Sequence, residues 1–170
     1  MKAPEISLVI PCHNEQENLQ PLLSAIRATM DPLGLDFEVV ITDDCSTDNS
    51  WSVLKQLSAN DQRLRVQRFK LNCGESAASW AGMQVARGRY IATLDADLQN
   101  DPNDLPAMIE ALSHADCVCG TRITTRRSGD NWVRIVSSRI ANWVRNKLSG
   151  ETISLTLQFR RRTVVVVVHY

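Results

Sequence analysis

Two aspartates, Asp95 and Asp97, directly follow a short apolar run, Tyr90-Ile-Ala-Thr-Leu94. Two carboxylates at the end of a buried strand are costly unless something compensates their charge. A hard divalent cation such as Mg²⁺ or Mn²⁺ does so, because it takes oxygen ligands and keeps positions open for phosphate oxygens. The amide of Gln99 could join such a site. The alternative is a solvated, Asp-rich turn.

Two further polar clusters follow other apolar runs. Asp43 and Asp44 end one run, and a carboxylate there can accept hydrogen bonds from a nucleobase imide or from ribose hydroxyls. The segment from Pro11 to Glu15 ends another, and its rigid proline followed by histidine, asparagine and glutamate could frame a base and a ribose. Both clusters have a structural alternative, in which Asp48 and the asparagine or glutamate serve the first turns of the helices that follow.

The formal net charge of zero hides an asymmetry along the chain. Residues 1–121 carry 17 acidic and nine basic residues, whereas residues 122–147 carry seven basic residues and one acidic residue. An anionic partner would explain the basic stretch, and an ordinary solvated helix face is the alternative. At its start, Arg122, Arg126 and Arg127 could clamp phosphates or could simply be surface charge.

The basic stretch continues into a pattern that predicts an amphipathic helix over residues 131–148, with two tryptophans, Trp132 and Trp143. Such a helix is typical of a membrane surface, and packing on a protein core is the alternative. No stretch of the chain has the roughly 18 apolar residues that a spanning helix needs, and the first apolar run is too short for a signal peptide. The sequence therefore predicts a cytoplasmic chain without a membrane anchor of its own.

Strand-like and helix-like segments alternate through residue 120 with short connections. This order predicts an α/β fold with a mostly parallel sheet flanked by helices on both faces. Ligands of such sheets bind beyond the carboxyl ends of the strands, so we expect the three acidic clusters to converge on one edge. The expected strands span residues 6–10 (ended by Pro11), 37–42, 64–69, 90–94 and 116–120. The expected helices run from Leu19 to Met30, from Trp51 to Leu57, from Asn72-Cys-Gly74 to near Gly88, and from Leu105 to Leu112.

Several classes of protein lack their fingerprints in this sequence. Neither a GxGxxG motif nor a Walker loop is present, which argues against a Rossmann oxidoreductase and a P-loop nucleotidase. Five cysteines without a CxxC pair argue against a metal knuckle or a disulfide framework. No recognisable nucleic-acid motif accompanies the basic stretch, so nucleic acid is not an expected partner.

Four blocks of the chain carry a resemblance to a known family. Three of them are Leu8-Val-Ile-Pro-Cys-His-Asn-Glu-Gln-Glu-Asn-Leu19, Val40-Ile-Thr-Asp-Asp-Cys-Ser-Thr-Asp48 and Leu94-Asp-Ala-Asp-Leu-Gln-Asn-Asp-Pro102, and the fourth is Asn72-Cys-Gly-Glu-Ser-Ala-Ala. The first three, at matching spacing, resemble the signature of family 2 glycosyltransferases, and the fourth sits where that family has an Asn-x-Gly block. The subgroup that the chain resembles comprises the dolichol-phosphate and undecaprenyl-phosphate sugar transferases.

The resemblance implies a GT-A fold and a metal-dependent, inverting transfer from a UDP- or GDP-linked sugar to a polyprenyl phosphate, at the cytoplasmic face of a membrane that residues 131–148 would touch. The implied contacts with the nucleotide sugar are Pro11, His13, Glu15, Asp43, Asp44, Asp95 and Ala96. The implied ligands of Mg²⁺ or Mn²⁺ are Asp95, Asp97 and Gln99. Catalytic roles are implied for Asp97 and Arg122, and a lipid phosphate would lie near Arg122, Arg126 and Arg127.

The resemblance stops at Ser154. We therefore expect residues 1–154 to form an incomplete catalytic domain, which could bind a donor nucleotide yet transfer nothing. Residues 155–170 are expected to be a divergent tail, produced by a frameshift or a premature end. The valine run that begins at Val164 has strong β-propensity, so a real terminal strand is the other reading. Two further functions stay open: a non-catalytic module that binds nucleotide sugars, and a nucleotidyltransferase on a similar core.

Overall fold

The computed structural model describes residues 3–113, 117–119 and 163–166. All of them belong to one compact unit, formed by Met1–Thr121 and Arg161–Tyr170. The second unit, Arg122–Arg160, lies outside the described residues, and with it lie the three predicted phosphate-binding arginines and the predicted basic helix. In the described ranges, no helix has both the length and the apolar character needed to cross a membrane.

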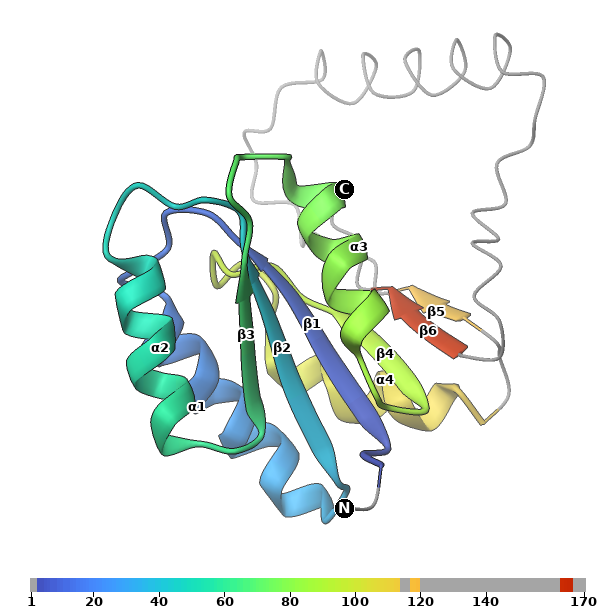
Figure 1. Ribbon diagram of the computed structural model, residues 1–170. Helices are drawn as coiled ribbons and strands as arrows, with labels where there is room; N and C mark the ends of the chain where they lie inside the picture. Colours follow the sequence, from blue (N-terminus) through green and yellow to red (C-terminus); the bar gives the residue numbers. More distant parts are fainter. Residues whose placement is uncertain (1–2, 114–116, 120–162, 167–170) are drawn as a thin grey trace, which may run out of the picture. The chain divides into compact units, whose positions relative to one another are not determined.

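A parallel sheet with the strand order β3-β2-β1-β4-β6-β5 forms the centre of this unit (Figure 1). The predicted α/β class is thus confirmed, and β1 lies between β2 and β4. The strands are β1 (Ile6–Cys12), β2 (Phe37–Asp43), β3 (Leu64–Arg68), β4 (Tyr90–Thr93), β5 (Cys117–Cys119) and β6 (Thr163–Val166).

Helices cover both faces of the sheet, with α3 on one face and α1, α2 and α4 on the other (Figure 1). The α3 helix lies close to β1, because a Cβ atom at Gly82 would stand 2.6 Å from Val9 Cγ1. The helices are α1 (Leu19–Met30), α2 (Ser50–Asn60), α3 (Glu75–Val85) and α4 (Leu105–Ala111), with short 3₁₀ turns η1 (Asp31–Leu33) and η2 (Pro102–Asp104).

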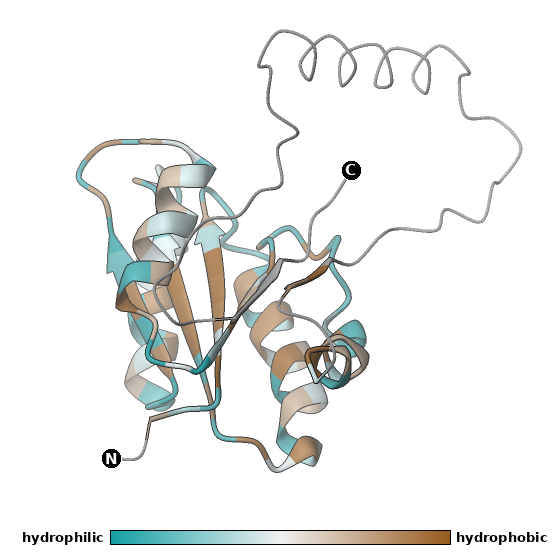
Figure 2. Ribbon diagram, turned by 90° about the vertical axis from the view of Figure 1, so that its right-hand side faces the viewer, coloured by the Kyte–Doolittle hydropathy of each residue, from teal (hydrophilic) through white to brown (hydrophobic). Residues whose placement is uncertain are grey.

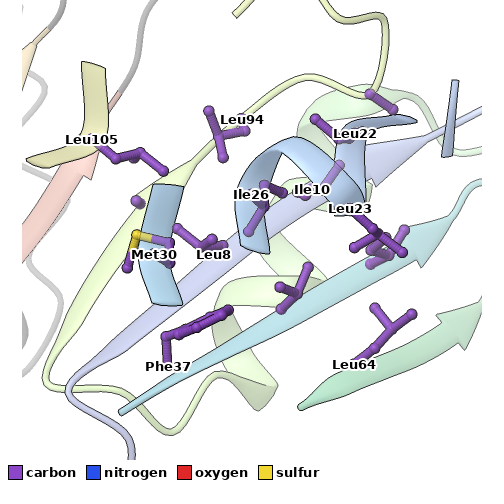
Figure 3. Packing of buried hydrophobic residues seen from close by; sticks show 14 of the residues in the cluster. Leu8, Ile10, Leu22, Leu23, Ile26, Met30, Phe37, Leu64, Leu94 and Leu105 are labelled. Atoms are coloured by element: carbon purple, nitrogen blue, oxygen red, sulfur yellow. The ribbon is translucent and has the colours of Figure 1, made fainter. Parts of the chain in front are cut away.

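The strands β1 and β2 are buried along their whole length, as expected for parallel strands covered on two faces. Alternate side chains of β1 face α1, where Leu8 and Ile10 pack with Ile26 and Met30 (Figure 3). On the opposite face, Val9 belongs to a smaller cluster beneath α3. Figure 2 shows the strands in the middle of the sheet largely in the colour of hydrophobic residues. A slip of one residue would disturb the packing on both faces, so close packing holds the register of these strands and hence the heights at which they end.

The first strand is longer than predicted, because Pro11 lies inside β1 rather than ending it. Proline lacks the N–H group that a strand interior normally needs. The β4 ladder ends where Thr93 pairs with Val9, and the N–H of Leu94 donates to the carbonyl of Val9. Pro11 lies two residues after Val9, so its backbone nitrogen faces the same side as the backbone of Val9. At this height β4 has already ended. Its missing donor therefore leaves no partner unsatisfied.

The valine run contributes β6, which pairs with β4 on one side and with β5 on the other. Thr163 pairs with Tyr90, and Val164 pairs with both Ile91 and Cys117. Residues 155–162 and 167–170 lie outside the described residues. The run thus forms a strand in the structure, and the divergent origin of residues 155–170 stays a prediction.

A buried carboxylate lies at the end of the sheet opposite the predicted site. Glu38, which is 1% exposed, accepts hydrogen bonds from Ser7 Oγ at 2.7 Å and from the backbone N–H of Arg87 at 2.6 Å. Arg87 Nη2 and Arg65 Nη1 lie 2.7 and 3.2 Å from Glu38 Oε2. Burial opposes ionisation of this group, but the hydrogen bonds from Ser7 and Arg87 outweigh it and lower the Glu38 pKa.

We predict that Glu38→Gln lowers the free energy of unfolding by about 3 kcal/mol at pH 7, because it leaves buried donors without a charged partner. The contribution of Glu38 is complete above its unfolded-state pKa, near 4.5, and is lost as the pH falls through the lower folded-state value. Denaturant titrations at several pH values measure this. The matched control is Glu17→Gln at an exposed position. Equal stability of the two variants at pH 7 would contradict the assignment.

Candidate functional site

A pocket of about 250 Å³ opens beyond the carboxyl ends of β1, β2 and β4. The strands that follow β1 along the chain, β2 and β3, lie on one side of it, and the next strand, β4, lies on the other side. The pocket therefore lies where the strand order reverses, which is the usual ligand position in such sheets. It is lined by Pro11, Cys12, His13, Glu15, Asp44, Glu75, Asp95, Ala96 and Asp97. The structure thus brings together residues from all three predicted acidic clusters.

The charge of this pocket is strongly negative. Five of its lining residues are carboxylic acids, and no lysine or arginine is among the described residues that line it. Like charges placed this close repel one another and repel any anionic ligand. Binding of a diphosphate therefore needs positive charge that offsets this repulsion. A cation could supply it, or basic side chains outside the described residues.

The Asp95 and Asp97 carboxylates are partly engaged already. Asn100 Nδ2 donates to Asp95 Oδ2 at 3.0 Å, and the backbone N–H of Gln99 donates to Asp97 Oδ1 at 3.0 Å. No hydrogen bond from a described residue engages the other oxygen of either carboxylate. Two oxygen donors of this kind suit Mg²⁺ or Mn²⁺, which takes its remaining ligands from phosphate and water.

Two observations bear on the predicted metal ligands. Within the described residues, no group of three or more His, Cys, Asp or Glu side chains could hold a metal ion. The third predicted ligand, Gln99, is exposed and does not line the pocket. The donor set that the pocket itself offers is therefore the pair of carboxylates.

Asp44 fixes the wall of the pocket that leads into α3. Its Oδ1 accepts from the N–H of Cys73 at 2.7 Å, and its Oδ2 accepts from the N–H of Gly74 at 2.8 Å. Gly74 has φ 90°, a conformation that a side chain would strain. Asp44 is 3% exposed, so its first role is to hold this turn.

Asp43 does not line the pocket, although the sequence placed it with Asp44. Strand alternation sends its side chain to the α1 and α2 face, where it is fully buried and lies 2.9 Å from Arg68 Nε. Arg68 also donates to the carbonyl of Ser46 at 2.8 Å. The ion pair therefore ties β2 and β3 to the loop before α2.

His13 is exposed, and its ring is oriented by its neighbours. Its Nδ1 lies 2.9 Å from the carbonyl oxygen of Asp44, and a carbonyl only accepts, so Nδ1 donates this hydrogen bond. In the neutral ring, Nε2 is then the acceptor, and Asn14 Nδ2 lies 3.2 Å from it. The imidazole thereby presents a defined edge next to the pocket.

Asn14 joins the loops that follow β1 and β2. Its Oδ1 accepts from the N–H of Thr47 at 2.7 Å and from that of Asp48 at 3.3 Å, and its own N–H donates to Ser46 Oγ at 2.9 Å. Asp48 Oδ1 accepts from the N–H of Ser50 at 2.9 Å and so serves the start of α2, as predicted. The sequence analysis offered Asn14 a role in framing a base and a ribose or in the first turn of a helix, and did not foresee this link between the two loops.

Strained backbone gathers around the pocket. Among the described residues, the non-glycine residues with positive φ are Asn14, Cys45 and Leu98, at 58°, 58° and 62°. Each follows one of the three strands that end at the pocket. Such a conformation is uncommon and unfavourable for leucine, and it persists where surrounding contacts over-determine it, often at functional sites.

Cys12 lines the pocket but is not suited to be a nucleophile. Burial, followed by the charges of Asp43 and Glu15, raises its pKa to about 12. A thiol with such a pKa stays protonated at neutral pH, and the reactive form of cysteine is the thiolate. The chemistry of the pocket therefore rests on its carboxylates.

Comparisons with known proteins agree with this geometry. The sequence profile of glycosyl transferase family 2 matches residues 7–165, and the chain belongs to this family. An undecaprenyl-phosphate 4-deoxy-4-formamido-L-arabinose transferase of Aeromonas hydrophila is 36% identical over 85% of this chain and 44% of that protein. A dodecaprenyl-phosphate galacturonate synthase of Rhizobium johnstonii is 36% identical over 86% and 44%. The chain spans less than half the length of these curated relatives.

Solved structures share the fold, which is the GT-A fold of glycosyltransferases. The mannosyltransferase PcManGT of Pyrobaculum calidifontis, in complex with GDP-Man and Mn²⁺, has a TM-score of 0.60 and 22% identity over 72% of this chain and 37% of that chain. The TarS protein of S. aureus, residues 1–349 with UDP-GlcNAc, has a TM-score of 0.56 and 23% identity over 74% and 37%.

We predict that Asp44→Asn lowers the free energy of unfolding by about 1.5–3 kcal/mol, because one backbone N–H then faces an amide N–H₂ group instead of a carboxylate oxygen. The same change should weaken nucleotide binding by loosening the turn before α3. Denaturant unfolding at pH 7 measures the first effect. Asp104→Asn, at an exposed position on η2, is the control. Unchanged stability of the Asp44 variant would contradict the role given to this carboxylate.

Proposed function

We propose that the chain carries the donor-binding part of a glycosyltransferase that moves a sugar from a UDP- or GDP-linked donor to a polyprenyl phosphate. The observation that carries the proposal is the acidic pocket at the strand ends, where Asp95 and Asp97 stand together. The names of the relatives support the acceptor class, and the nucleotides bound to the structural neighbours support the donor class.

The acidity of the pocket supports metal-dependent binding of the donor. In this proposal Asp95 and Asp97 hold Mg²⁺ or Mn²⁺, with Gln99 as the third proposed ligand. The bound cation would neutralise the diphosphate of the donor. Pro11, His13, Glu15, Asp44 and Ala96 would frame the nucleotide sugar, whereas Asp43 would act by holding the loop before α2.

The acceptor needs alignment more than it needs a strong base, because a lipid phosphate is already ionised at neutral pH. Its oxygen would form a bond to the anomeric carbon while the bond from that carbon to the diphosphate breaks, which inverts the configuration. Arg122, Arg126 and Arg127 are the proposed lipid-phosphate ligands. Residues 131–148 are the proposed contact with the cytoplasmic face of the membrane. Both assignments rest on the sequence alone.

We predict that UDP or GDP raises the unfolding midpoint of the chain only when Mn²⁺ or Mg²⁺ is present. A ligand at 100 times its Kd stabilises the native state by about 2.7 kcal/mol. Thermal unfolding with UDP, GDP, CDP and ADP, each with and without metal, measures the shift. Asp97→Asn should abolish the metal-dependent part, whereas Asp104→Asn should keep it. A full shift in the Asp97 variant would overturn the metal site.

We predict that the chain releases a nucleoside diphosphate when it is incubated with polyprenyl phosphate and a nucleotide sugar. The nucleotide sugar used is one whose nucleotide binds in the thermal unfolding experiment. The assay follows the lipid product and the released nucleotide together. Release of pyrophosphate would indicate a nucleotidyltransferase instead. Nucleotide binding without any turnover would indicate a binding module and would contradict the transfer reaction while leaving the donor site intact.

A further inference from the structure

Asn100 is the buried polar neighbour of the proposed metal site, and the sequence analysis did not single it out. It lies between the Asp95-Ala-Asp97 segment and η2, is 3% exposed, and donates from Nδ2 to Asp95 Oδ2 at 3.0 Å. Asp95 itself is partly buried in the pocket wall. This hydrogen bond therefore joins a side chain that does not line the pocket to one that does.

The chemistry of the two groups sets the orientation of the amide. An ionised carboxylate only accepts hydrogen bonds, so Asn100 must present its N–H₂ group to Asp95. Its Oδ1 then lies in the interior, where no described residue donates to it. A buried acceptor without a partner costs about 1–3 kcal/mol. An apolar side chain of similar size would avoid this cost, so stability alone does not account for an asparagine here.

Both carboxylates of the proposed site have one oxygen engaged in the same way. Asn100 occupies Asp95 Oδ2, and the backbone N–H of Gln99 occupies Asp97 Oδ1. Each aspartate therefore keeps one oxygen that accepts no hydrogen bond from a described residue, and that oxygen is the more available ligand for a cation. Monodentate carboxylates suit the small, octahedral Mg²⁺, whereas Ca²⁺ takes six to eight oxygens and readily binds carboxylates through both.

We propose that Asn100 is a positioning residue that makes Asp95 a monodentate ligand and thereby favours Mg²⁺ or Mn²⁺ over Ca²⁺ at the donor site. The inference rests on the proposed metal site at Asp95 and Asp97. Asn100 acts through Asp95 and does not touch the cation. Residues outside the first ligand shell commonly change metal affinity by about 10–100-fold when they are replaced.

The test compares the affinities of Mn²⁺ and Ca²⁺ for the full chain in the presence of UDP and, in parallel, of GDP. Calorimetry measures both ions, and the electron paramagnetic resonance signal of Mn²⁺ gives a second measurement for that ion. Asn100→Leu removes the amide at similar size, and Asn100→Ala removes it without bulk if the leucine variant does not fold. We expect the ratio of Mn²⁺ affinity to Ca²⁺ affinity to fall about tenfold or more. Thermal unfolding without metal should show a midpoint close to that of the wild type.

The matched control is Asn103→Leu, because Asn103 Nδ2 makes a similar hydrogen bond to Asp101 Oδ1 at 2.8 Å, at an exposed position outside the pocket. The control should keep the wild-type ratio. An unchanged ratio in the Asn100 variants, with metal bound by the wild type, would overturn the inference and leave the proposed function standing. No metal-dependent nucleotide binding by the wild-type chain would overturn both.

Discussion

The parallel pairing of β1 with β2 on one side and β4 on the other is the interaction on which the site depends. This pairing sets three strand ends side by side, and the loops that leave them carry the polar residues. A slip of one residue would exchange the side chains of the two buried faces and would separate the hydrogen-bonded pair Ser7 and Glu38, which join β1 to β2. The apolar core therefore determines where the carboxylates of Asp44 and Asp95 stand.

Holding several carboxylates around one pocket works against their mutual repulsion, and the loops show how the chain manages it. Backbone N–H groups bind both oxygens of Asp44, and a side-chain amide binds one oxygen of Asp95. Asn14 ties the first two loops together, and the positive φ angles of Asn14, Cys45 and Leu98 lie in these same loops. The pocket is thus preorganised before any ligand enters, at a cost in local backbone strain.

The acidity of the pocket is the physical reason for including a cation in the proposed donor site. The charged side chains among the described lining residues are all carboxylates, apart from the imidazole of His13, so attraction for a diphosphate would come mainly from a metal ion or from residues beyond the described part. The same family fold is found in neighbours that bind UDP-GlcNAc or GDP-Man with no more than 23% identity to this chain. The fold is therefore shared where most of the sequence differs.

The sequence by itself determined the α/β class and the succession of strands and helices along the chain up to residue 120. It also determined the convergence of the Pro11–Glu15, Asp44 and Asp95–Asp97 clusters. Both follow because apolar periodicity and strand-end position are local properties. Only the tertiary structure decided that Asp43 turns away from the pocket to Arg68, that Pro11 remains inside a strand, and that Asn100 holds Asp95. The first two depend on the strands that lie alongside, and a neighbour brought in from a distant part of the chain leaves no trace in the local sequence. The third depends on how the loop after β4 turns back, which places Asn100 against a residue five positions earlier.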